Sequence, residues 1–144
     1  HHGIDTEQFK PDSSIEREDH ALSVVNDWIN RDWCCGFRIW QEVIEGLPNR
    51  VVGDTPGLSE PSKTTEGLVK EYQSSRIFLN TSTISPVPTA LLEAMACGCA
   101  VVSTSTCMIP EIKARETVLK KFSLDSFIKT WNKVFGMTSN FSVW

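Results

Sequence analysis

Short apolar runs alternate along this chain with longer segments whose apolar residues recur at helical spacing. Runs of strand length occupy residues 21–26, 50–54, 77–79 and 99–102. Helical spacing or strong helix formers instead mark residues 37–46, 64–75 and 89–97. Strands that alternate with helices predict an α/β fold, a Rossmann-like, mainly parallel sheet with helices on both faces.

Residues 76–103 form the clearest unit, a strand, a loop, a helix and a second strand. Pro88 suits the first helical position, where a missing N–H costs nothing, and Gly98 suits the left-handed end of the helix. The order predicts a parallel strand pair joined by a right-handed crossover.

The remaining segments are assigned by composition. Residues 13–20 are polar and predict a solvated segment, residues 27–36 an unusual loop, and residues 55–63 a turn and an open loop. Beyond the last clear strand we expect a loop, a charged helix over residues 113–121 and an amphipathic helix capped by Ser123. The 144 residues predict one domain over residues 1–136 and a tail over 137–144.

Composition narrows the class of protein. The chain is 40% hydrophobic and 22% charged, as in ordinary globular domains. A net charge of -4 gives no reason to expect a nucleic-acid partner. No apolar run approaches the roughly 20 residues that span a bilayer, and a peripheral membrane contact stays open. The five cysteines lack the paired spacing of a zinc site, so we expect reduced thiols, a cytoplasmic location and no metal.

The N-terminal end of the predicted helix over residues 89–97 is the candidate binding site. Its free N–H groups and positive dipole end would attract an anion, and no Asp or Glu lies in the preceding loop, residues 80–88. Thr89 adds a hydroxyl, and Glu93 lies one turn further on the same face. A phosphate at the N-terminus with a polyol against Glu93 would satisfy these groups. Spacing alone favours the simpler alternative, a helix start followed by a solvated carboxylate.

Several common enzyme classes are excluded by missing motifs. The sequence contains neither the G-x-G-x-x-G dinucleotide fingerprint nor a phosphate-binding P-loop, and no G-x-S-x-G nucleophile elbow. All three histidines fall within the first 20 residues, outside any predicted strand end, which argues against a histidine-based triad.

Six segments match one family pattern in order along the chain. They are His-Gly-Ile-Asp at 2–5, Phe-Lys-Pro at 9–11, Val-Val-Gly-Asp-Thr-Pro at 51–56, the segment from Tyr72 to Ser82, Ala-Leu-Leu-Glu-Ala-Met-Ala-Cys-Gly-Cys-Ala-Val-Val at 90–102, and Pro-Glu-Ile at 110–112. Together they resemble the C-terminal, donor-binding half of GT-B fold glycosyltransferases, in the retaining group known as family 4 or group 1.

The resemblance implies a nucleotide-diphosphate sugar, such as a UDP- or GDP-sugar, as donor substrate. Glu93 would bind the ribose hydroxyls, because a carboxylate can accept from both. Thr89 and Ala90 would hold the diphosphate at the helix start after Pro88. Gly53 and the turn after it would approach the donor from a neighbouring strand.

The resemblance also implies the partners. The reaction would be glycosyl transfer to an unknown acceptor, a glycan, lipid or small molecule. A separate N-terminal half would supply the acceptor site and close over the donor. Neither a cofactor nor a metal is implied, because this fold stabilises the diphosphate with a helix dipole and cations.

The sequence departs from the family at charged positions. Ser85 stands where the family has a Glu that grips sugar hydroxyls, and it would be a sugar contact here. Cys35-Gly36 stands where Lys-Gly is usual, which leaves Arg31 as the cation for the phosphates. Some tens of family residues are missing after Ile112. A non-catalytic nucleotide-sugar-binding or assembly module is therefore the alternative to an active transferase.

Overall fold

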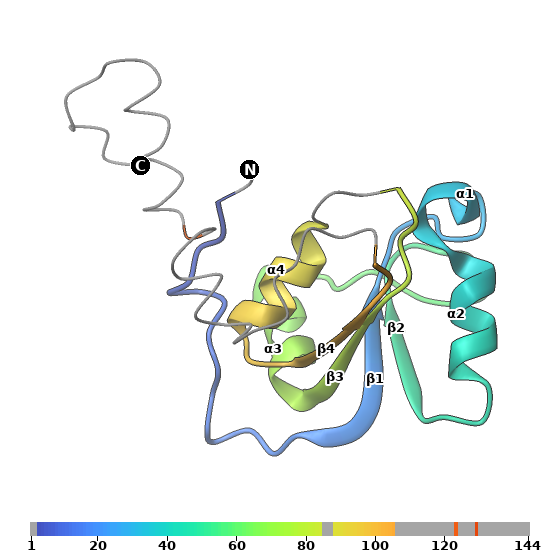
Figure 1. Cartoon of the computed structure of the whole chain (residues 1–144). Coiled ribbons are helices and arrows are strands. Elements are labelled where there is room, and N and C mark those ends of the chain that lie inside the picture. Colours follow the sequence, from blue (N-terminus) through green and yellow to red (C-terminus); the bar gives the residue numbers. More distant parts are fainter. Residues whose placement is uncertain (1–2, 85–87, 106–122, 124–128, 130–144) are drawn as a thin grey trace.

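Four parallel strands form the centre of the computed structural model, which describes residues 3–84, 88–105, 123 and 129. The strands are β1 (Glu18–Val24), β2 (Asn49–Val52), β3 (Ser75–Asn80) and β4 (Ala100–Ser103). Their order across the sheet is β2-β1-β3-β4, and every neighbouring pair is parallel (Figure 1). The prediction of a parallel α/β sheet is confirmed.

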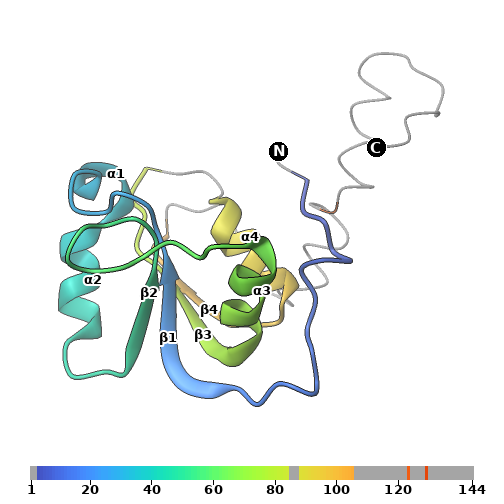
Figure 2. The same ribbon diagram turned by 180° about the vertical axis from the view of Figure 1, so that it is seen from behind.

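The helices lie on both faces of this sheet. Helices α1 (Asp32–Cys35) and α2 (Phe37–Ile44) cover one face, and α3 (Thr65–Ser74) and α4 (Thr89–Ala96) lie side by side on the other (Figures 1 and 2). Successive side chains of β3 point to opposite faces of the sheet. Phe78 packs among the buried residues of α3 and α4 on one face, and Leu79 packs with the aromatic residues next to α2 on the other.

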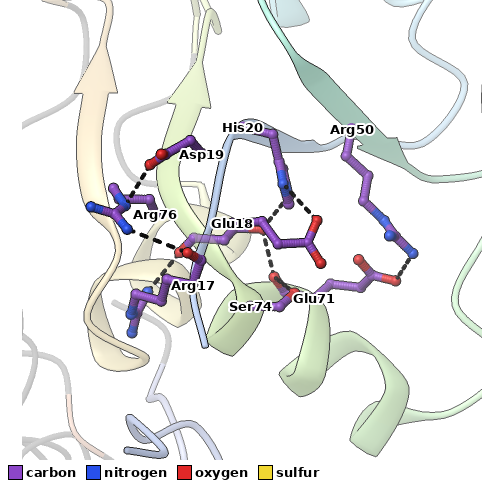
Figure 3. Close-up of polar contacts among 9 residues, drawn as sticks. Arg17, Glu18, Asp19, His20, Arg50, Glu71, Ser74 and Arg76 are labelled. Atoms are coloured by element: carbon purple, nitrogen blue, oxygen red, sulfur yellow. Dashed lines mark hydrogen bonds and ion pairs between the residues drawn. The ribbon is translucent and has the colours of Figure 1, made fainter. Parts of the chain in front are cut away.

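Two boundaries differ from those expected. The predicted loop over residues 27–36 contains the short helix α1, which Gly36 ends in a left-handed conformation that starts α2 directly. The predicted solvated segment over residues 13–20 includes the start of β1 at Glu18. Its polar composition did not predict a strand, because the partners of these side chains lie far along the chain. Asp19 pairs with Arg76 at 2.8 Å (Figure 3), and His20 forms a hydrogen bond with the Ser75 hydroxyl at 2.9 Å.

Arg17 links the N-terminal segment by hydrogen bonds to the start of β3 and the end of α4. Its guanidinium donates to the carbonyl oxygen of Ser75 and to that of Cys97, each at 2.6 Å. These carbonyls lie at the start of β3 and just after α4. The arginine therefore fixes α4 against the sheet from the edge opposite to the strand ends that carry the candidate site.

Most elements expected after β4 lie outside the described residues. This applies to the charged helix over residues 113–121, the amphipathic helix beyond Ser123 and the tail over residues 137–144. Within the described part, Ser123 forms a parallel bridge with Ile4, which places residue 123 beside the N-terminal segment. The domain boundary at residue 136 stays a prediction.

Candidate functional site

A cleft of about 490 Å³, here called the main cleft, lies where the carboxyl ends of β1 and β3 meet the start of α4. Ligands bind outside the carboxyl ends of strands in open parallel sheets, so its place is typical of a binding site. Its described lining consists of Val24, Val25, Asn26, Arg31, Cys34, Cys35, Phe78, Leu79, Asn80, Ser82, Ile84, Pro88, Thr89 and Ala90.

The N-terminus of α4 forms one wall of the main cleft. Pro88 caps the helix in an extended conformation, and no side chain accepts from the first N–H groups. The N–H groups of Leu91 and Leu92 reach the Pro88 carbonyl, at 3.1 and 3.3 Å. Those of Thr89 and Ala90 have no acceptor among the described residues. Two unpaired donors at the positive end of a helix favour an anion.

Arg31 supplies the only charged side chain among the described residues that line the main cleft. Its guanidinium donates to the Asn26 carbonyl at 3.3 Å and forms no ion pair within the described part of the chain. No described carboxylate lines the cleft to neutralise it. The cleft therefore combines a cation with helix N–H groups, which is the electrostatic pattern of a phosphate site.

The loop between β3 and α4 is anchored on the carbonyls of Cys34 and Cys35. The Cys34 carbonyl accepts from the N–H of Thr83 at 2.9 Å, and the Cys35 carbonyl accepts from the Thr81 hydroxyl at 3.1 Å. Gly36 lies directly against Thr81, because a Cβ at Gly36 would lie 2.0 Å from the Thr81 carbonyl oxygen. This close approach holds the loop after β3 against the start of α2.

Cys35 adds no charge to the site. Burial, together with a hydrogen bond to Cys34, raises the pKa of its thiol to about 11. The thiol is thus neutral at physiological pH. Among the described residues that line the main cleft, the positive charge therefore comes from Arg31 alone.

Glu93 lies one turn beyond Thr89 on α4 but does not line the main cleft. It is half-buried, and its Oε2 accepts a hydrogen bond from the Tyr72 hydroxyl at 2.8 Å. Burial raises the pKa of the Glu93 carboxyl, and the bond from Tyr72 partly offsets this effect. The alternative of a freely solvated carboxylate is therefore wrong.

Gly53 lines a second opening, here called the side cleft, of about 390 Å³. Val24 and Asn26 belong to both clefts, so the two openings adjoin at the end of β1. The backbone of Gly53 has φ 151°, and a Cβ there would lie 1.9 Å from the Val25 carbonyl oxygen. Glycine is therefore required for β1 and β2 to end side by side.

The structure brings most of the predicted site residues together. Arg31, Pro88, Thr89 and Ala90 share the main cleft, while Gly53 lies in the adjoining one. Ser85 is outside the described residues.

Two polar cleft residues were not singled out from the sequence: Asn26, and Asn80 at the start of the loop over residues 80–88 that the family resemblance places against the sugar. Each is a polar residue at the end of an apolar run, and that position is the signal that would have found them.

Neither a metal cluster nor a membrane span was found in the described part of the chain. No group of three or more His, Cys, Asp or Glu residues there could hold a metal ion. Within the same ranges, no helix is long and apolar enough to cross a bilayer.

Comparison with solved structures supports the fold. A sucrose-phosphate synthase from Thermosynechococcus elongatus matches with a TM-score of 0.65 at 12% identity, over 95% of this chain and 52% of the synthase. The chain thus spans about half of that enzyme. The C-terminal domain of a glycosyl transferase group 1 family protein from Francisella tularensis matches with a TM-score of 0.47 at 14% identity, over 94% of this chain and 92% of that domain.

The family assignment comes from the sequence. No functionally curated protein matches this chain. The family described as glycosyl transferases group 1 matches residues 45–131, which is more than half of the chain and includes β2, α3, β3, α4 and β4. The expected resemblance is confirmed, and the chain belongs to the glycosyl transferases group 1 family.

Proposed function

We propose that this chain is the donor-binding half of a glycosyltransferase and binds a nucleotide-diphosphate sugar in the main cleft. The observation that carries the proposal is that the N–H groups of Thr89 and Ala90, which have no acceptor among the described residues, line the same cleft as the Arg31 guanidinium, which forms no ion pair there. Membership of the group 1 family supports the choice of a diphosphate over other anions.

Each group then has a role in the transfer of a glycosyl unit. The bond between the anomeric carbon and the diphosphate breaks, negative charge grows on the departing phosphate, and an acceptor hydroxyl attacks the sugar. Donors aimed at growing charge stabilise such a transition state. Thr89, Ala90 and Arg31 are the donors here, while Glu93 would hold the ribose and Ser85 would contact the sugar. The acceptor would be bound by an N-terminal half outside this chain.

A second candidate is a binding or assembly module without catalysis. The neutral Cys35 thiol, at a position where the family has a lysine, favours it because one phosphate cation is missing. Both candidates share the same donor site. Transfer of sugar in the presence of an N-terminal partner half would distinguish the active enzyme from the module.

The proposal is tested by calorimetric titration of the chain with UDP, GDP and ADP, and with the matching nucleosides. We expect one diphosphate to bind with a Kd between micromolar and low millimolar and its nucleoside to bind much more weakly. Arg31→Ala should weaken binding of the diphosphate by about 1.5–3 kcal/mol, the usual loss for a charged hydrogen bond, and leave nucleoside binding unchanged.

The matched control is Arg76→Ala, at the opposite edge of the sheet, where the arginine pairs with Asp19 (Figure 3). This variant should bind the diphosphate like the original chain. Equal losses in the two variants would mean that Arg31 acts only through net charge, and the proposed phosphate site would be wrong.

A further inference from the structure

The hydroxyl of Tyr72 reaches the carboxylate of Glu93 from inside the protein core. Tyr72 is the eighth residue of α3 and is 0% exposed. Its ring packs edge-on against Phe9 with ring centroids 6.2 Å apart, and in a tilted arrangement against Phe78 at 5.9 Å. Only the hydroxyl is directed to a charged group, since it donates to Glu93 Oε2 at 2.8 Å.

This packing makes the hydroxyl a fixed donor. A ring held by two other aromatic side chains cannot move with Glu93, so the carboxylate must take the conformation that the hydroxyl selects. The hydrogen bond occupies one lone pair of Oε2. The described residues supply no donor to Oε1, and Glu93 is only half-buried, so the carboxylate keeps acceptor capacity beyond the bond from Tyr72.

The hydrogen bond from Tyr72 opposes the effect of burial on the pKa of Glu93. Burial favours the protonated carboxyl, while a donor to Oε2 favours the ionised form that accepts hydrogen bonds. Besides Glu93, the groups around the phenol that can carry charge are Cys97 and Cys99, and burial raises the pKa of the Cys99 thiol. The Cys99 thiol accepts from Arg17 and donates to the carbonyls of Tyr72 and Ser75. The hydrogen bond from Tyr72 is the side-chain contact that lowers the pKa of Glu93. Tyr72 is therefore the group through which the core acts on this carboxylate.

We propose that Tyr72 is a positioning residue that orients the Glu93 carboxylate for a ribose diol and thereby sets the preference for ribonucleotides. The inference rests on the proposed function, because it requires Glu93 to face the ribose. A purely structural role, in which Glu93 only satisfies a buried hydroxyl, is the opposing explanation.

The experiment measures affinity of Tyr72→Phe for a nucleoside diphosphate and for its 2′,3′-dideoxy analogue, between pH 5 and 8. Phenylalanine keeps the ring and removes the donor. We expect about 3–10-fold weaker binding of the ribonucleotide and no more than about twofold for the dideoxy analogue. Loss of the donor also raises the pKa of Glu93, so the fall in ribonucleotide affinity with decreasing pH should begin at a higher pH than in the original chain.

The matched control is Phe9→Leu, which disturbs the packing of the same ring without touching Glu93. It should lower thermal stability and leave the pH profile in place. Equal losses for both nucleotides in Tyr72→Phe, or an unmoved pH profile, would overturn the positioning role.

Binding of both nucleotides by the unsubstituted chain distinguishes failure of this inference from failure of the proposed function. If that chain binds the ribonucleotide and the dideoxy analogue equally well, the ribose role of Glu93 is wrong and this inference fails, while the diphosphate site stands. If it binds neither, the proposed function itself is wrong. If it prefers the ribonucleotide, and Tyr72→Phe keeps that preference in full, only the role of Tyr72 is wrong. A double variant, Tyr72→Phe with Glu93→Gln, should lose no more ribonucleotide affinity than Glu93→Gln alone.

Discussion

Gly36→Ala should lower the free energy of unfolding by about 3 kcal/mol or more, because it combines a backbone penalty with a steric overlap. Gly36 has φ 65°, and an added Cβ would lie 2.0 Å from the Thr81 carbonyl oxygen. Backbone must move to relieve that contact, since neither atom belongs to a flexible side chain. Urea denaturation followed by circular dichroism measures the loss.

Gly46→Ala is the matched control for this substitution. Gly46 has a similar φ of 74°, but an added Cβ there meets nothing within 4 Å. Gly46→Ala should lower the free energy of unfolding only by the backbone penalty, about 1 kcal/mol. Equal losses at Gly36 and Gly46 would mean that the contact of Gly36 with Thr81 adds no steric penalty to the substitution.

Glu93→Gln should weaken binding of the ribonucleotide by about 1–3 kcal/mol, because a charged acceptor of hydrogen bonds is replaced by a neutral one. The amide is close to the carboxyl in size and keeps an oxygen that can accept from Tyr72. Titration with the nucleoside diphosphate measures this loss. An unchanged affinity would contradict the ribose role of Glu93.

The same substitution should make the ligand-free protein more stable at neutral pH. Burial raises the pKa of Glu93 in the folded state, so ionisation costs stability as the pH rises from the unfolded pKa through the folded one. Glutamine removes that cost. Urea denaturation should show a gain for Glu93→Gln at pH 7.5 that shrinks as the pH falls and is nearly gone at about pH 3.5, where the carboxyl is protonated in both the folded and the unfolded state. A gain that persists at pH 3.5 would contradict a protonation effect.

Strands and helices with clear apolar patterns were predictable from the sequence. The unit around α4 follows from Pro88, Gly98 and the helix formers between them, and β3 begins only two residues before its predicted start at Ile77. The helix α1 was missed, because four residues are too few to display a helical period. The start of β1 was missed because its charged side chains find their partners on β3.

The site was predictable as far as it depends on local sequence. Free N–H groups at Thr89 and Ala90 follow from the helix start, and the resemblance pointed to Arg31. The contact of Tyr72 with Glu93 was not predictable, since it joins two helices through tertiary packing. The same holds for the approach of Gly36 to Thr81, which no pattern of spacing displays.

Nuclear magnetic resonance of the ¹⁵N-labelled chain, titrated with a nucleoside diphosphate, tests the donor site most directly. If the diphosphate binds at the start of α4, the backbone amides of Thr89 and Ala90 should show the largest downfield proton shifts, with the Arg31 side chain moving in parallel. Absence of shifts with UDP, GDP and ADP up to millimolar concentration, or shifts confined to residues outside the main cleft, would contradict the account.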